Sequence, residues 1–450
     1  MYDFGPLAAN DDPRILDYFH TTNQISELLA NPESKRSFLI VARPGGGKTA
    51  LVTWLKNGPN SKRVITIDSS VARFLIDNDS IATHEDQSLF FSSELYRILF
   101  SKVIAKEDVS ESLRSECNDY LNSIYEALKK TLGKVNSISF AGFGFSLKPE
   151  EKRSYLDIIR KEQKITKAKP IIQRIAKEQK FILSIDNPES IVGKGLNVVT
   201  TENGIRIGSF FSSLAELKNL GIQVIVFVKE HIMQLVLNSF SDASHFKDQI
   251  LSLEWTEKDL IELINLRVEK RISSNWENVF DITKDEFKRL VFPNLINGPR
   301  DLISVCNRAG DGKGRITSHD LKQGINNLRN DKWREIQLEF INQWPGVDQF
   351  SRVIIEIINK EISSKEFTKD QFINVIKNEF EKPDTALNQL RKKEDWINSA
   401  LLDPPPVDER MFIIGVLGYI HDKTKYYPWS GQSVDRYRLA NKVFISSLFS

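Results

Sequence analysis

The sequence has little cysteine, methionine or histidine, and it contains no long apolar run. Only Cys117 and Cys306 occur in 450 residues, so we expect two reduced thiols rather than a disulfide, and no zinc site. The six histidines lack the spacing of metal ligands. The longest apolar run, at 411–420, is too short to cross a bilayer and predicts a core element. The first residues lack a basic segment followed by an apolar one, so we expect a cytoplasmic protein that no membrane holds.

The chain also lacks a strong net charge. Its 62 basic residues face 60 acidic ones, a formal charge of +2, so the whole chain is not an obvious binder of polyanions. One segment departs from this balance. Residues 151–180 carry ten Lys or Arg against four acids, a local charge of +6. This segment indicates either a solvated helix face or a contact with nucleic acid or a partner.

What the sequence does contain is a phosphate-loop pattern. Residues 38–55 read FLIVARPGGGKTALVTWL, an apolar run followed by glycines, a lysine, a threonine and a helical pattern. The pattern G-x-x-x-x-G-K-[ST] is met except at its first glycine, where Ala42 stands. Glycine N–H groups, a helix N-terminus, an ammonium and a hydroxyl together suit a Mg²⁺-bound polyphosphate. The alternative is a plain glycine-rich turn. The predicted nucleotide-binding residues are Arg43, Pro44, Gly45, Gly46, Gly47, Lys48, Thr49 and Ala50.

A second candidate lies at 180–190, KFILSIDNPES, where an apolar strand ends in Asp186. In a P-loop ATPase such a carboxylate holds Mg²⁺ directly or through water. Asn187 follows it, and Glu189 is a candidate base for the attacking water. The alternative is an ordinary strand that ends in a turn, because Asp-Asn-Pro is also good turn chemistry.

Two further basic residues stand at the ends of predicted elements. Lys229 ends a predicted strand at 222–230. Arg300 opens a predicted helix after Gly298-Pro299, in NGPRDLIS. An arginine at the start of a lid helix can reach the γ-phosphate. Otherwise it would pair with a nearby acid such as Asp301 or Asp311.

The remaining pattern is largely helical. A second strand is predicted at 63–68, and residues 138–149 favour a hairpin or a flexible loop. Near the end, TKYYPWS and DRYRLA predict two short strands, so that helices followed by a hairpin resemble a winged helix. The predicted helices are 14–29, 87–130, 208–219, 252–272, 350–362, 368–381 and 384–400.

In this order the parts resemble the AAA+/STAND class of P-loop ATPases, and most of all its bacterial STAND- and KAP-like members. The resemblance covers most of the chain. It implies an α/β fold with a P-loop parallel-sheet core, a helical lid and a C-terminal winged-helix domain. An extra strand would lie between the phosphate-loop strand and the Asp-ended strand. The implied domains are 1–250 for the core, with a helical or hairpin insertion at about 87–170, then 251–345 for the lid and 346–450 for the winged helix.

The resemblance also implies roles for residues. Lys48 would bind the β- and γ-phosphates of ATP, and Thr49 and Asp186 would hold Mg²⁺. Lys229 and Arg300 would be sensors. Asn187 stands where the family commonly has a second acid, so hydrolysis would be slow unless Glu189 acts as the base.

The function implied is an ATP-binding and hydrolysing switch or oligomerising regulator, as found in anti-phage defence loci. Its partners would be ATP and ADP, together with further copies of the chain or a separate effector protein. One alternative is a DNA-dependent AAA+ ATPase of the loader or transposition-helper type. Another is a scaffold that binds nucleotide without hydrolysing it.

Overall fold

The structure is a computed structural model that forms two compact units. Unit 1 comprises residues 1–27, 42–51 and 252–450, and unit 2 comprises residues 28–41 and 52–251. The residues that the structure describes are 2–22, 25–26, 39–59, 61–67, 83–132, 149–192, 201–312, 314–341, 344–399, 406–430 and 434–450.

Unit 2 is built on a five-stranded sheet with the order β2-β3-β4-β1-β5. β2, β3 and β4 pair in parallel. Branched apolar residues dominate these strands, as expected of a parallel sheet buried on both faces. The predicted α/β fold with a parallel sheet is therefore confirmed. β4 lies between β1 and β3, which is the extra strand that the resemblance implied. The strands are β1 Leu39–Ala42, β2 Val64–Ile67, β3 Ile182–Asp186, β4 Gln223–Lys229 and β5 Ile250–Ser252.

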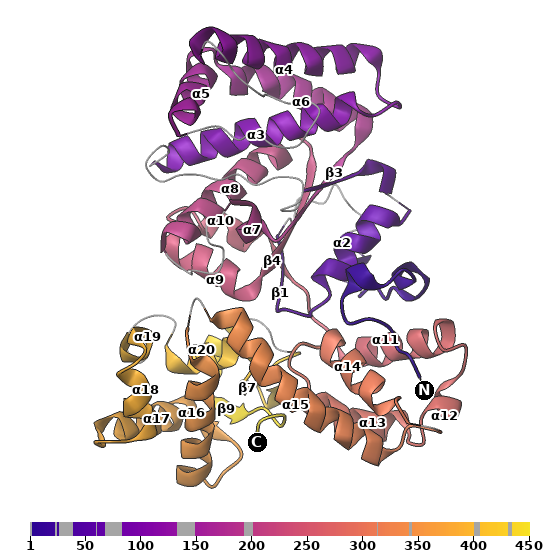
Figure 1. Ribbon diagram of the computed structural model, residues 1–450, viewed down its shortest axis with the longest axis vertical. Helices are drawn as coiled ribbons and strands as arrows, with labels where there is room; N and C mark the ends of the chain where they lie inside the picture. Colours follow the sequence, from indigo (N-terminus) through magenta and orange to yellow (C-terminus); the bar gives the residue numbers. More distant parts are fainter. Residues whose placement is uncertain are drawn as a thin grey trace. The chain divides into compact units, whose positions relative to one another are not determined.

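Helices α7, α8 and α9 pack against β4, and Figure 1 shows them along one side of the strands. α3 packs against α8 and α4, which confirms the helical prediction for 87–130 as two helices. The predicted hairpin or loop at 138–149 falls outside the described residues up to residue 148. The helices that continue from the sheet are α2 Lys48–Asn57, α3 His84–Ile104, α4 Glu111–Leu132, α5 Pro149–Lys161, α6 Lys164–Gln179, α7 Pro188–Val192, α8 Thr201–Asn219, α9 Glu230–Ser239 and α10 Ser244–Lys247.

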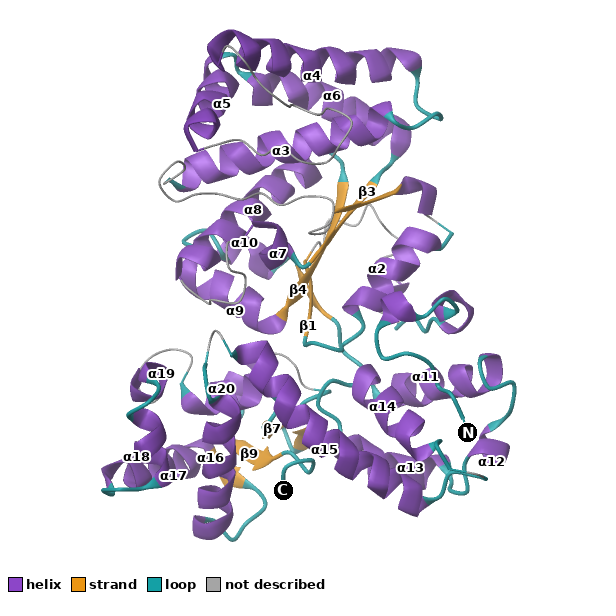
Figure 2. Ribbon diagram, viewed as in Figure 1, coloured by secondary structure: helices purple, strands orange, loops and turns teal. Residues whose placement is uncertain are grey.

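Unit 1 is mainly helical, with a second sheet near its end (Figure 2). This sheet has the order β6-β9-β7-β8 and is antiparallel. The elements before it are 3₁₀ helices η1 Ala9–Asp11 and η2 Ile15–Tyr18, then α11 Glu257–Lys270, α12 Trp276–Val279, α13 Lys284–Val291, α14 Pro299–Ala309 and α15 Ser318–Phe340. The C-terminal elements are α16 Val347–Glu361, β6 Phe367–Thr368, α17 Lys369–Glu381, α18 Ala386–Arg391, α19 Asp395–Ser399, α20 Val407–Ile413, β7 Leu417–His421, β8 Thr424–Tyr426, α21 Val434–Leu439 and β9 Lys442–Ile445.

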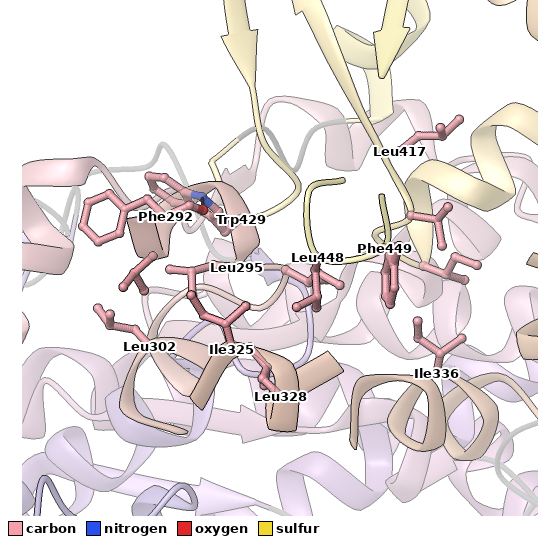
Figure 3. Packing of buried hydrophobic residues seen from close by; sticks show 14 of the residues in the cluster. Phe292, Leu295, Leu302, Ile325, Leu328, Ile336, Leu417, Trp429, Leu448 and Phe449 are labelled. Carbon is pink, nitrogen blue, oxygen red and sulfur yellow. Dashed lines mark hydrogen bonds between the residues drawn. The ribbon is translucent and has the colours of Figure 1, made fainter. Parts of the chain in front are cut away.

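One hydrophobic core joins the helices of 257–340 to the C-terminal elements. Figure 3 shows Leu448 and Phe449 packed among side chains of α14 and α15. The Phe449 ring lies 4.3 Å from that of Trp333, centroid to centroid. Trp429 donates from Nε1 to the Phe292 carbonyl oxygen at 2.8 Å. Because the two segments share one core, they stabilise each other.

The predicted strand at DRYRLA is wrong, since these residues lie in helix α21 and the short loop after it. Alternation of polar and apolar residues suggested a strand, but Val434 and Tyr437 are both buried at a spacing of three, which one helix face satisfies. Tyr437 donates to Asp408 at 3.0 Å, and Arg438 pairs with Glu409 at 2.8 Å. The partner of β8 in the hairpin is β7, which the apolar run at 411–420 supplies. That run is buried, as predicted.

Three predicted helices differ in extent. Within the segment 14–29, Ile15–Tyr18 form the short helix η2, residues 19–22 are not helical and residues 25–26 are helical, while residues 23–24 and 27–29 lie outside the described residues. The segment 252–272 becomes helical only at α11, because Thr256 caps that helix in a capping box with Asp259. The segment 384–400 divides into α18 and α19. Among the helices that the structure describes, none combines the length and apolar character needed to span a membrane.

Candidate functional site

The phosphate loop follows β1 directly and runs into the N-terminus of α2. Gly45 and Gly47 have φ angles of +77° and +98°, which residues with a Cβ rarely adopt. Lys48, Thr49 and Ala50 form the first turn of α2. Lys48 is buried, with 7 % of its surface exposed. Without side chains, Gly45 lies close to the start of α14 and Gly47 lies close to Trp255. A glycine loop that leads into a helix N-terminus beside a lysine and a threonine fits a polyphosphate.

A cradle for anions turns N–H groups inward, so its outward carbonyl groups need donors elsewhere. Lys48 Nζ donates to the carbonyl oxygens of Ala42 and Arg43, at 2.6 and 2.9 Å. Trp255 Nε1 donates to the Gly46 carbonyl oxygen at 2.9 Å. The Asn297 side-chain amide donates to the carbonyl oxygen of Pro44 at 3.3 Å. These four contacts hold the loop in shape.

Arg43 connects the loop to the C-terminal helix α20. Its guanidinium donates to the Phe412 carbonyl oxygen at 2.7 Å and lies 4.5 Å from the centroid of the Phe412 ring. Arg43 is 2 % exposed. Gly415, just after α20, lies close beneath this arginine, because a Cβ there would come within 3.6 Å of Arg43 Nη1. The side chain of Arg43 thus points away from the cradle and into the C-terminal segment.

Arg300 and Asn297 place the start of α14 against the loop. A Cβ added to Gly45 would lie 2.9 Å from the Cβ atoms of both residues. Arg300 pairs with neither of the two acids considered above, Asp301 and Asp311. Asp301 instead forms an ion pair with Lys332. In the part of the chain that the structure describes, the Arg300 guanidinium makes no hydrogen bond or ion pair. A cavity of about 230 Å³ adjoins these residues. Its lining includes Arg43, Pro44, Asn297, Arg300, Lys332 and Phe340.

The carboxylate candidates lie in unit 2. Asp186 is the last residue of β3, and Asn187 turns the chain with φ +51° into α7. Glu189 lies in the first turn of α7 and is 8 % exposed. Its Oε1 lies 3.7 Å from Nζ of Lys229, the last residue of β4. Two of the predicted residues, Glu189 and Lys229, are therefore neighbours.

Trp255 is a site residue that the sequence analysis missed. It is 7 % exposed and lies directly before α11. His20 contacts Asp259 of that helix at 3.0 Å. Burial alone would raise the pKa of Asp259, but hydrogen bonds from Thr256 and His20 outweigh burial and hold the pKa below its ordinary value of 3.8. The charged carboxylate therefore stabilises the start of α11, next to the indole that binds the loop. Tryptophan has no place in the phosphate-loop pattern, so no sequence signal identified it.

No protein-family model matches the chain, and no curated protein matches it. Among the solved structures that are similar to it is that of the ORC2 protein of Aeropyrum pernix, determined as ADPNP–ADP complexes. The identity is 9%, the TM-score is 0.39, and the match covers 94% of this chain and 95% of that one.

Proposed function

We propose that the chain binds ATP at the phosphate loop and acts as a nucleotide-dependent switch of the AAA+/STAND kind. The observation that carries this proposal is the set of contacts around the loop. Trp255, the start of α14 and helix α20 all contact backbone or side chains of residues 43–47. A ligand that changes the shape of the loop must change these contacts. It can then favour one arrangement of unit 1 over another in proportion to its differential affinity.

The roles within the site follow from chemistry. Lys48 would give up carbonyl contacts for the oxygens of the β- and γ-phosphates. The Thr49 hydroxyl and the Asp186 carboxylate would supply the hard oxygen ligands that Mg²⁺ prefers, and Mg²⁺ would neutralise phosphate charge. Arg300 would contact the terminal phosphate. Glu189 would orient and deprotonate the attacking water, with Lys229 beside it.

We expect Glu189→Gln to retain ATP and to release phosphate at least about a hundredfold more slowly, because a general base contributes about 10²–10⁴-fold. Phosphate release under single-turnover conditions measures this. Glu202→Gln is the matched control: Glu202 also pairs with a basic residue, Arg206 at 2.6 Å, but lies on α8. Hydrolysis at the wild-type rate by Glu189→Gln would remove the base assignment. No hydrolysis by the wild type would favour a scaffold that only binds nucleotide.

The switch itself is tested at Phe412. Phe412→Leu removes the ring beside Arg43 but keeps the carbonyl that accepts its hydrogen bond. In the wild type, we expect a slowly hydrolysed ATP analogue to change amide hydrogen exchange in α20 relative to ADP. A cation–π contact contributes about 0.5–2 kcal/mol. We therefore expect the logarithm of the exchange-rate ratio between the ATP analogue and ADP to be at most half as large in the variant as in the wild type.

The matched control for this experiment is Phe444→Leu. Phe444 is also buried, and Lys425 Nζ lies 4.1 Å from its ring centroid in the same segment, so both variants lose a buried ring that contacts a cation. The control should keep the wild-type response. Exchange in wild-type α20 that is indifferent to the nucleotide would contradict the switch.

The DNA-dependent alternative depends on the ten basic residues of the stretch 151–180. Four basic residues of the stretch 151–180 are paired with acids. Lys169 pairs with Glu216 at 2.8 Å and Lys164 with Glu162 at 2.7 Å, while Arg160 pairs with Asp86. Arg174 contacts Glu116 and Glu178. Charges neutralised in this way release fewer counterions from a phosphate backbone. The proposed partners are further copies of the chain or a separate effector. Measuring mass in solution with ADP and with an ATP analogue tests for further copies.

A further inference from the structure

A buried ion pair lies behind the phosphate loop, in the lid helices. Lys332 of α15 and Asp301 of α14 each have 1% of their side-chain surface exposed, and Nζ lies 2.7 Å from Oδ1. Burying two charges is unfavourable unless their remaining hydrogen bonds are made. Asp301 Oδ2 accepts the N–H groups of Ile296 and Asn297, at 2.9 and 2.8 Å. The pair thus fixes the turn that precedes α14 as well as joining the two helices.

The same lysine reaches the loop through Asn297, which is 8 % exposed. The orientation of the Asn297 amide is assigned from its neighbours. Oδ1 accepts from Lys332 Nζ at 3.0 Å, and Nδ2 donates to the Pro44 carbonyl oxygen at 3.3 Å, whereas the reverse orientation would place donor against donor. A continuous polar path therefore runs from Asp301 through Lys332 and Asn297 to Pro44.

The path ends at the carbonyl group of Pro44. Proline has no N–H group, so the carbonyl is its only polar backbone group, and Asn297 is the donor that holds it. The next residue, Gly45, lies against Arg300, whose guanidinium has no partner in the described parts of the chain. The path thus controls two things together: the shape of the loop opening and the position of a free cation beside it.

Resting on the nucleotide role proposed above, we propose that Asn297 and Lys332 are positioning residues that let the site distinguish a nucleoside triphosphate from a diphosphate. They hold the Pro44 carbonyl outward and place Arg300 at the loop opening, where only the terminal phosphate of a triphosphate meets it. Loss of either link would leave the β-phosphate contact of Lys48 and the phosphate contacts of the loop amides in place, and a diphosphate uses these contacts as well. The effect should therefore fall on discrimination between the two ligands.

The test is the ratio of affinities of the full chain for a slowly hydrolysed ATP analogue and for ADP, measured by calorimetry with Mg²⁺. We expect the wild type to favour the ATP analogue and Asn297→Ala to reduce this preference about three- to tenfold, the effect of one hydrogen bond. Lys332→Met should reduce it by at least as much. ADP affinity should change less than threefold in Asn297→Ala, which keeps the buried ion pair.

Glu335→Gln is the control, because Glu335 contacts Lys332 at 2.5 Å but is not on the path to the loop. It should keep the wild-type ratio. A role confined to packing would lower the melting temperature and both affinities together, so an unchanged ratio in Asn297→Ala overturns the inference. A wild type that binds both ligands equally also overturns it. A wild type that binds neither instead overturns the proposed function.

Discussion

Lys48→Ala is expected to reduce ATP affinity by about ten- to a hundredfold. Hydrogen bonds to charged groups contribute about 1.5–3 kcal/mol, and each 1.4 kcal/mol corresponds to a factor of ten. The effect should lie at the upper end. In the structure the ammonium binds the carbonyl oxygens of Ala42 and Arg43 at 2.6 and 2.9 Å, contacts that the nucleotide would replace. Because the ammonium would then contact both the β- and the γ-phosphate, its removal takes away more than one charge-assisted hydrogen bond. Calorimetry with a slowly hydrolysed ATP analogue measures the loss.

The control is Lys56→Ala, which removes an exposed lysine from the last turn of the same helix α2. We expect this variant to bind like the wild type. Thermal unfolding without nucleotide should show Lys48→Ala folded, with a loss of about 1 kcal/mol for the missing contacts. Wild-type affinity in a folded Lys48→Ala protein would refute the assignment of the loop as a phosphate site.

The sequence predicted those parts of the fold that local patterns determine. The strand ending in Asp186 and the strand ending in Lys229 are both present, because short apolar runs bounded by turn residues specify buried strands. The glycines at 45–47 predicted a loop between a strand and a helix, and the structure has such a loop between β1 and α2. The order of strands followed from the family resemblance rather than from any local pattern.

The contacts around the loop were not predictable in this way. Trp255 lies 209 residues from the Gly46 carbonyl that it binds, and Phe412 lies 369 residues from Arg43. Such contacts depend on how whole elements pack, which a single sequence does not reveal. The alternation in DRYRLA was likewise misleading, because burial of Val434 and Tyr437 on one helix face overrode the strand pattern. Tertiary packing therefore supplied what local periodicity lacked.

These long-range contacts connect the phosphate loop to α14 and α20. A phosphate loop is usually described by the residues that face the ligand. Here the groups that face away from the loop contact other elements of unit 1. Asn297 binds the carbonyl of Pro44, and Arg43 projects onto Phe412. A substitution at the loop should therefore be felt in α14 and α20 even where no ligand is bound.

Gly45→Ala is expected to lower nucleotide affinity at least about tenfold. The new Cβ would lie 2.9 Å from the Cβ atoms of Asn297 and Arg300, so the start of α14 must move away from the loop. Overpacking of this kind is unfavourable by about 1–3 kcal/mol. The φ angle of +77° adds a penalty of about 1–2 kcal/mol for a residue with a side chain. Because Arg300 moves with α14, affinity for the ATP analogue should fall more than affinity for ADP.

Gly314→Ala separates the two penalties. Gly314 also has a positive φ angle, +118°, but a Cβ there would meet nothing within 4 Å. This control should lose stability through its backbone alone and should bind nucleotide like the wild type. Calorimetry and thermal unfolding of both variants make the comparison. If Gly45→Ala bound the ATP analogue and ADP as tightly as the control does, α14 would not lie against the phosphate loop in solution, and the coupling between the loop and α14 would have to be abandoned.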